Sequence, residues 1–412
     1  MTGSTIDHMV AVTVFLGAIL VFIGLFNQTI QTAILYQRHR QLATKCSDLL
    51  DNILLNPGYP FDWGKSNCTP TSFGLQDPEF TQYKLSPFSL MRLLSSTGDP
   101  VYYAKTGLYY SNITMGFGNF LLLPYTEAIN YSTATRLLGT NGSYGFQLNI
   151  APIVKVVISE VQLEDPLTLA IDVTGTGFPM PNAEVTYCFL TVSARAGGGS
   201  FPSYEIESGI VTTDEKGSAT LSFADVNGET DSYVLIAYAH LAGLTGVGHH
   251  KHVTSTKQYI IPFVDNLKER KVLIAHSYDV HYFGPPVAEL SYNATFVLLT
   301  EDFTLREMPM ENSTTGKVGK VNYGEGKPFG VVTIPTYNPG ILIITYRKSA
   351  VECGVVLMPW GISSMSFPVT FGDDPSSREW VTTDVRQVIV NEIAYQANLA
   401  LWSLEGYEAI GQ

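Results

Sequence analysis

Histidine is the residue type whose spacing in this 412-residue chain comes nearest to a chemical site. Six of the eight histidines lie between His240 and His281, and three of them share the stretch GHHKH. His250 and His252 point to one face if this stretch is extended, because alternate residues of a strand share a face. Imidazoles placed in this way suit first-row transition metals. The candidate ligands are His249, His250, His252 and His281.

Two observations argue against a metal centre. A closed zinc site takes four ligands, and the sequence contains neither an H-E-x-x-H motif nor a nearby cysteine pair. We therefore predict no metal, no cofactor and no catalytic residue, and we interpret the GHHKH stretch as a polar, exposed connector between domains. The alternative is a membrane-tethered metal-binding protein or metal-dependent hydrolase that uses the cluster from His240 to His281.

Other enzyme signatures are missing from the sequence. It has no G-x-S-x-G nucleophile motif, no Walker A loop and no G-x-G-x-x-G between a strand and a helix. The carboxylate pairs Glu301-Asp302 and Asp373-Asp374 are adjacent in sequence, so in an extended chain their side chains point apart. The net charge of −13 argues against a nucleic-acid partner, which needs clustered lysine and arginine. We predict that the protein is not an enzyme.

Cysteine and asparagine offer sites of covalent linkage. The four cysteines show no C-x-x-C spacing, and two interpretations remain open: a local disulfide between Cys46 and Cys68, worth about 3 kcal/mol in the loop-entropy model, or four buried thiols. Seven N-x-S/T sequons occur, and the one at Asn27 lies too close to a bilayer to be modified. The other six fall in polar, turn-rich context and are the glycosylation candidates: Asn67, Asn112, Asn130, Asn141, Asn293 and Asn312.

One apolar segment organises the chain. Met9 to Phe26 carries no charge and, as a helix, spans about 27 Å, close to the roughly 30 Å core of a bilayer. No lysine or arginine precedes it, which favours a retained anchor over a cleaved signal peptide. Nothing stops the helix before Asn56-Pro57-Gly58, so one helix from Ile6 to Leu55 is predicted. Its second half is amphipathic and needs a partner, either the chain's own β-domain or the same helix in neighbouring copies.

The rest of the chain predicts a mainly β protein, with short alternating strands separated by Gly, Pro, Asn and Asp. We expect two antiparallel, Ig-like β-sandwiches and a C-terminal helix over Asp384 to Leu404. Ser86 and Pro87 indicate the start of a short helix. The predicted units are a tail (1–8), a transmembrane anchor (9–35), an amphipathic extension (36–55), a juxtamembrane module (56–150), a first sandwich (151–254), a second sandwich (255–371) and a C-terminal helix with its tail (372–412).

Two resemblances accompany these patterns. The helix ending in LLDNILLNPGYPFDWG (Leu49 to Gly64) and the stretch RLLGTNGSYGFQLNI (Arg136 to Ile150) resemble archaeal type IV pilin-like membrane proteins. The segment from Ser4 to Val12 lacks the Lys/Arg-Gly junction at which prepilins are cleaved. GTGFPMPNAEVTYCFL followed by VTTDEKGSATLSF is similar to Ig-like modules of surface adhesins and to transthyretin-like domains. These resemblances imply a fold and a place at the cell surface rather than a reaction.

The topology signals conflict. Arg38, Arg40 and Lys45 follow the anchor, which by the positive-inside rule would place the large domain in the cytoplasm. The sequons and the sandwich composition favour the outside, and we expect an extracellular domain on a single-pass cell-membrane protein. The expected function is pilin-like surface assembly or adhesion, with the membrane and self-association or other surface proteins as partners. A second alternative is an accessory subunit of an archaellum-type or secretion machine.

Overall fold

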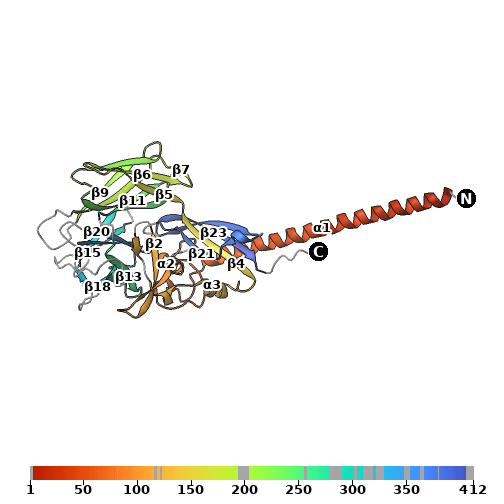
Figure 1. The fold of residues 1–412 in the computed structure, drawn as a ribbon, viewed down its shortest axis with the longest axis horizontal. Coiled ribbons are helices and arrows are strands. Elements are labelled where there is room, and N and C mark those ends of the chain that lie inside the picture. The colour runs from red at the N-terminus through yellow and green to blue at the C-terminus, as the bar shows by residue number, and fades with distance from the viewer. Residues whose placement is uncertain are drawn as a thin grey trace.

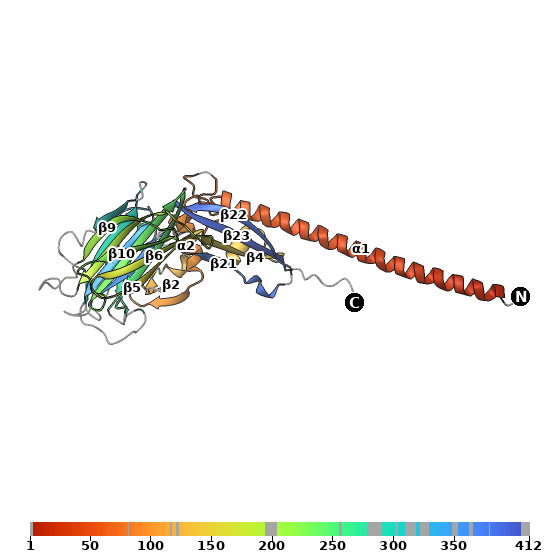
Figure 2. The same cartoon turned by 90° about the horizontal axis from the view of Figure 1, so that it is seen from above.

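A long helix projects from a β-rich head in the computed structural model of the chain (Figure 1). The view turned by 90° shows the same arrangement, with most of the helix clear of the head (Figure 2). The predicted class, mainly β with a long N-terminal helix and antiparallel sheets, is confirmed. The structure describes residues 3–80, 82–115, 118–120, 123–193, 204–254, 258–277, 280, 290–300, 304–309, 319–321, 329–347, 353–361, 366–378 and 380–404.

Helix α1 (Gly3–Leu55) is continuous, as predicted. It contains a segment that is long and apolar enough to cross a membrane, and none of that segment is buried within the protein. Its last turns, from Leu42 onward, lie against the strands β22 (Thr382–Val390) and β23 (Ile393–Ser403) of the head. The chain's own β-domain is therefore the partner of this part of the amphipathic stripe. Its buried residues are Leu42, Cys46, Leu49, Leu50, Ile53 and Leu54.

A polar clamp also fixes α1 to β22. The Arg386 guanidinium donates to Asp51 Oδ1 at 3.0 Å and to Ser47 Oγ at 2.9 Å on the helix. It also donates to Asp384 Oδ1 at 2.8 Å on its own strand, and Tyr83 OH donates to Asp51 Oδ1 at 3.2 Å. These groups are partly exposed, so the clamp adds less stability than the apolar contact beside it. It sets the rotation of the helix on the sheet.

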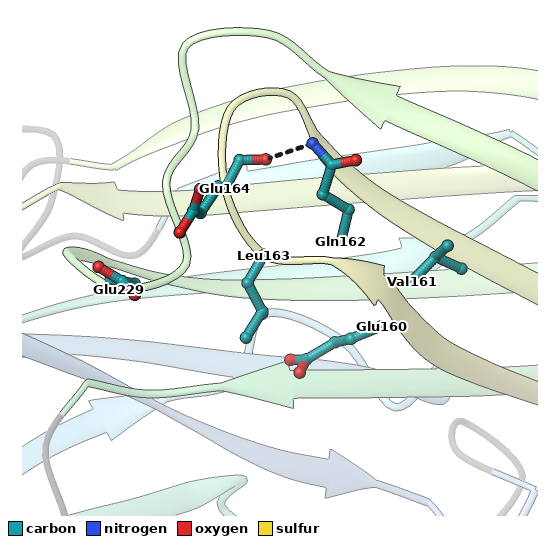
Figure 3. A pocket seen from close by; sticks show the side chains of 6 residues that line it. All are labelled: Glu160, Val161, Gln162, Leu163, Glu164 and Glu229. Atoms are coloured by element: carbon teal, nitrogen blue, oxygen red, sulfur yellow. Dashed lines mark hydrogen bonds between the residues drawn. The ribbon is translucent and has the colours of Figure 1, made fainter.

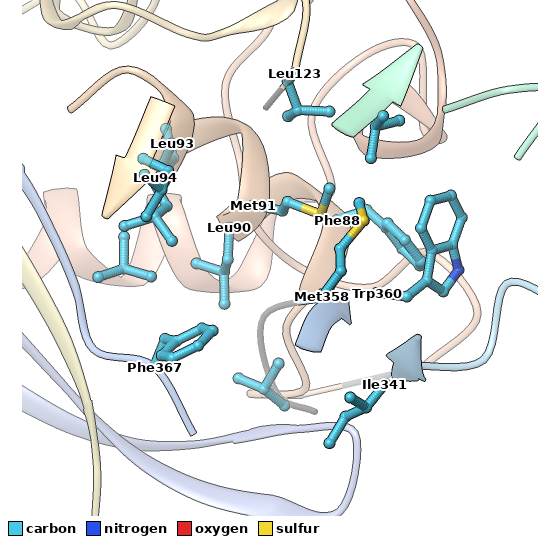
Figure 4. Close-up of a cluster of buried hydrophobic side chains, with 14 of the residues drawn as sticks. Phe88, Leu90, Met91, Leu93, Leu94, Leu123, Ile341, Met358, Trp360 and Phe367 are labelled. Carbon is cyan, nitrogen blue, oxygen red and sulfur yellow. The ribbon is translucent and has the colours of Figure 1, made fainter. Parts of the chain in front are cut away.

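The head continues from α1 into a compact turn and two short helices. The 3₁₀ helix η1 (Trp63–Lys65) brings Trp63 into the core, where its indole donates to the Pro57 carbonyl at 3.0 Å. Helix α2 (Pro87–Ser95) starts as predicted, with the Ser86 side chain accepting from the Ser89 amide. Its apolar side packs on the second sandwich, where Phe88 meets Trp360 edge to face at 5.3 Å (Figure 4). The other short helices of the described residues are η2 (Tyr125–Glu127), α3 (Tyr131–Leu137) and η4 (Pro375–Ser377).

The first sandwich is confirmed. One sheet has the order β10-β6-β5, with β7 beside β6, and the other has the order β12-β11-β8-β9. The Asp214–Gly217 turn before β10 has Gly217 at φ +76°, as its sequence predicts. The strands are β5 (Val154–Gln162), β6 (Leu167–Gly175), β7 (Phe178–Pro179), β8 (Glu184–Ser193), β9 (Glu205–Thr212), β10 (Ser218–Phe223), β11 (Asp231–Leu241) and β12 (Leu244–His252).

Strand β11 is buried on both faces. Tyr233, Leu235 and Ala237 face the core of the first sandwich, whereas Val234 and Ile236 face the second. This explains why β11 is a nearly continuous apolar run rather than an alternating one. The two sandwiches therefore share a central layer.

The second sandwich consists of the sheets β13-β14-β18 and β16-β15-β19-β20, with β17 beside β15. The hairpin β1–β2 covers the outer face of β13, where Tyr103 and Tyr110 pack on Phe263. The strands are β13 (Ile260–Asn266), β14 (Lys271–His276), β15 (Leu290–Leu299), β16 (Leu305–Pro309), β17 (Gly319–Val321), β18 (Phe329–Thr333), β19 (Gly340–Arg347), β20 (Cys353–Trp360), β1 (Asp99–Tyr103), β2 (Leu108–Met115) and β3 (Gly118–Phe120).

The predicted C-terminal helix is wrong. Residues 382–403 form the hairpin β22–β23, turned at Asn391 and Glu392, which both have positive φ. The apolar residues of this stretch fit a helical face, but alternate residues of β23 from Ile393 to Leu401 are buried, which is the period of a strand. The β-branched run VRQVIV also favours a strand.

The hairpin completes a four-stranded sheet, β21-β4-β23-β22, built from β4 (Tyr144–Pro152) and β21 (Val369–Gly372). Segments far apart in the sequence are thus paired, and β4 belongs to one sheet with the C-terminal strands. The predicted module 56–150 is therefore not self-contained. This sheet is the surface that receives α1.

A buried arginine on α2 joins this helix to η1 and η2 through backbone carbonyl oxygens. Arg92 is fully buried and donates to the carbonyl oxygens of Glu127 at 2.6 Å, Ser66 at 3.2 Å and Trp63. Burial lowers the pKa of Arg92 to about 10, against the opposing effect of Glu127. Burial also raises the pKa of the Glu127 carboxyl to about 7, although Arg92 acts in the opposite direction.

Glu127 should therefore make the head less stable as the pH rises. Between the ordinary pKa of about 4.5 and the folded value of about 7, the folded state binds more protons than the unfolded state. The free energy of unfolding should fall by on the order of 3 kcal/mol across this window and then level off. In chemical denaturation, the free energy of unfolding of Glu127→Gln should not show this fall with pH. If the variant showed the same fall as wild type, Glu127 would not be its cause.

The two halves of the α1 stripe should respond differently to truncation. Ile53→Ala removes a fully buried side chain from the helix–sheet contact and should lower the free energy of unfolding by about 3 kcal/mol. Ile34→Ala, at a position 38% exposed, should change it by less than about 0.5 kcal/mol. Denaturant titration of both variants in detergent, followed by tryptophan fluorescence, measures the difference. Equal losses would mean that the head also covers Ile34.

Candidate functional site

The histidine stretch forms a strand with a polar cluster at its end. GHHKH lies in β12, so the predicted connector is wrong, and the expectation that His250 and His252 share one face of an extended strand is confirmed. Both rings meet Glu160 of β5: His250 Nε2 and His252 Nδ1 each lie 2.9 Å from Glu160 Oε1. Tyr233 of β11 donates to the same oxygen at 2.6 Å. Three strands from two sheets therefore converge on one carboxylate.

Period-2 alternation explains the convergence. On β12, Gly246 and Gly248 precede the two histidines on the same face, and a Cβ on either glycine would lie within 2.8 Å of the β5 backbone or side chains. The glycines thus let β12 lie directly against Val154 and Val156. Glu160 lies in the same inward register as these valines. The larger imidazoles occupy the end of the strand pair, where the carboxylate receives them.

The electrostatics of the cluster favour a charged carboxylate. Burial alone would raise the pKa of Glu160, but the hydrogen bonds from Tyr233 and His250 and the nearby imidazoles lower it below its usual range. Burial and then the Glu160 carboxylate raise the pKa of the Tyr233 hydroxyl. The ring of His252 stacks on Tyr233 at 5.0 Å with an interplanar angle of 7°. Glu160 Oε1 accepts three hydrogen bonds and so links the sheet of β5 to the sheet of β11 and β12. We call this contact the Glu160 tie.

Beside the cluster lies an open, acidic depression of about 460 Å³ (Figure 3). Three carboxylates line it, from Glu160, Glu164 and Glu229, together with the apolar side chains of Val161 and Leu163. The Gln162 amide donates to the Glu164 carbonyl at 3.3 Å and shapes its rim. The lining contains no serine, cysteine or histidine placed as a nucleophile or base.

The other two candidate metal ligands, His249 and His281, do not join the Glu160 cluster in the described part of the chain. His249 points to the opposite face of β12, where it meets Phe367, and burial lowers its pKa to about 4. His281 lies outside the described residues. In the part of the chain that the structure describes, no group of three His, Cys, Asp or Glu side chains is placed to hold a metal ion. Glu160 and Tyr233 were missed by sequence reasoning, although Glu160 continues the inward alternation of its strand.

The cysteines form no disulfide between Cys46 and Cys68. Cys46 lies on α1 and is buried against β23, where its thiol lies 3.4 Å from the Leu399 carbonyl oxygen, and burial raises its pKa to about 11. Cys68 is exposed on a loop, 2.9 Å from Ser66 Oγ. Since Cys188 and Cys353 are also buried, the alternative of four buried thiols holds for three of them.

The sequons divide by environment. Asn67, Asn130 and Asn141 are exposed in turns or at a helix start, as predicted. Asn112 and Asn293 lie inside the strands β2 and β15, so turn context is wrong for these two. Asn312 lies outside the described residues.

Comparisons with known proteins identify no family. No family model and no curated protein matches the sequence. Three solved structures share 11% identity with it: red sea bream transglutaminase (TM-score 0.17) and Escherichia coli α2-macroglobulin in its elastase-activated and native forms (TM-score 0.20 each). They cover 61%, 57% and 68% of this chain, which spans 37%, 23% and 19% of theirs. Likenesses this weak carry no argument about activity.

The Glu160 tie should make the first sandwich sensitive to acid. Because the folded-state pKa of Glu160 is lowered, its contribution is fully present above the ordinary value of about 4.5 and is lost as the pH falls through the folded value. Glu160→Gln should cost about 1 kcal/mol at pH 7 and reduce the loss on acidification. Glu164→Gln, on the exposed rim, is the control and should behave as wild type. Denaturation at pH 7 and below pH 4 compares them.

Proposed function

We propose that this protein is a single-pass, membrane-anchored protein of the cell surface that displays its β-rich head outside and acts by contact rather than by catalysis. The observation that carries the proposal is the division of α1. Its apolar segment is uncovered, whereas the turns from Leu42 to Leu54 are packed into the head. An exposed apolar helix of this length needs lipid or other apolar helices around it.

We further propose a pilin-like role in surface assembly or adhesion. The support is the resemblance of the helix and of Leu49 to Gly64 to pilin-like proteins, together with a helix that joins its head over only part of its length. The apolar stripe continues beyond the head at Ile30 and Ile34, which are 41% and 38% exposed. A second copy of this chain would cover these residues by packing its own helix alongside.

Two measurements on intact cells test the placement. External protease should remove a tag fused after Gln412, and the intact mass of the membrane-extracted protein should include Met9 to Phe26. A tag protected until lysis would overturn the outward orientation. A mature chain that starts after Phe26 would show a signal sequence instead of an anchor.

Self-association should depend on the uncovered stripe. The double variant Ile30→Ser with Ile34→Ser should shift the detergent-solubilised protein towards the monomer in sedimentation, because it removes apolar surface between helices. Val157→Ser is a matched control, since Val157 is 42% exposed on the head and lies far from α1 in sequence. If both variants sedimented like wild type, assembly through this stripe would be excluded.

A further inference from the structure

We propose that Asn67, Asn130 and Asn141 carry N-linked glycans and that Asn112 and Asn293 do not. This inference rests on the proposed function, because the modification requires the head to face the compartment where glycans are attached. The structure adds what the sequons alone do not: which acceptor sites the folded head leaves open.

The transfer joins two groups and releases a third. A bond forms between the asparagine Nδ2 and C1 of a sugar, while the bond between C1 and the diphosphate of a polyprenyl-diphosphate-linked oligosaccharide breaks. The Nδ2 proton passes to a base of the transferase. The transferase must reach both the asparagine and the hydroxyl two residues later, since the N-x-S/T motif contains both.

At three sequons both groups are reachable. Asn67 and Thr69 are exposed on the loop that follows η1. Asn141, Gly142 and Ser143 are all exposed in the turn before β4, where Gly142 has φ +82°. Such exposed turns are where a bulky, solvated group fits on the surface.

Asn130 shows that a glycan is compatible with a structural role. Its side chain begins α3, and both of its hydrogen bonds use Oδ1, which accepts from the Thr133 amide at 2.8 Å and the Ser132 hydroxyl at 3.0 Å. Linkage through Nδ2 therefore leaves the helix cap in place. Asn130 and Ser132 are both exposed.

The two strand sequons lack this access. Asn293 lies in β15, which is paired on both sides, and the hydroxyl residue of its sequon, Thr295, is only 1% exposed and is bonded to Tyr204. Asn112 lies in β2 between β1 and β3, and its Oδ1 is buried. In the folded head, the transferase would therefore have to reach a side chain that is partly covered on a paired strand.

Two of the open sequons share a location. Asn130 begins α3 and Asn141 precedes β4, and both elements lie towards the end of the head from which α1 projects (Figure 1). The first sandwich, residues 151–254, contains no sequon. Glycans at Asn130 and Asn141 would thus lie near the point where α1 leaves the head, and the first sandwich would carry none.

The test is peptide mapping and intact mass of the full chain purified from its native membranes. Asn67→Gln and Ser143→Ala should each remove one glycan mass, and Ser132→Ala should remove the glycan at Asn130 while keeping the asparagine that caps α3. The peptides containing Asn112 and Asn293 should carry no glycan. A glycan on either strand sequon, or none on the three exposed ones, would overturn the inference.

Protease accessibility on the same cells separates the two proposals. An accessible head without glycans would overturn this inference and leave the proposed function standing. A protected head would overturn both.

Discussion

The burial of the last turns of α1 against the sheet β21-β4-β23-β22 is the contact on which the rest of the structure depends. A helix of 53 residues has far more apolar surface than this head can cover. Leu42 to Leu54 contribute the covered part, and Arg386 fixes the rotation of the helix through Asp51 and Ser47. Because this junction sets the helix direction, it also determines which end of the head faces the uncovered part of α1.

The same sheet explains how a chain with distant segments becomes one head. Strand β4 follows the N-terminal turns, whereas β21, β22 and β23 come from the end of the chain. Both sandwiches lie between them in sequence, so the sheet closes the chain on itself at the helix. Within the head, the doubly buried β11 joins the two sandwiches through a shared layer. A disturbance at the helix root therefore acts on a surface continuous with the core.

Much of this architecture could be predicted from the sequence, because local patterns specify it. The uncharged segment from Met9 to Phe26, the Ser86-Pro87 helix start and the Asp214–Gly217 turn each carry their signal within a few residues. The hairpin β22–β23 could not be recognised in this way, since its apolar positions fit both periods and only pairing with β4 decides between them. The burial of Cys46 against that hairpin could not be predicted from the sequence for the same reason.

The polar cluster shows the corresponding limit for a site. The pair His250 and His252 was visible as spacing, but its partner Glu160 lies 90 residues earlier, and only the close approach permitted by Gly246 and Gly248 brings them together. The imidazoles that suggested a metal instead donate to a carboxylate shared with Tyr233. A partly exposed tie of this kind joins β5 to β11 and β12 at the rim of the sandwich. Spacing alone therefore could not distinguish a structural contact between two sheets from a set of metal ligands.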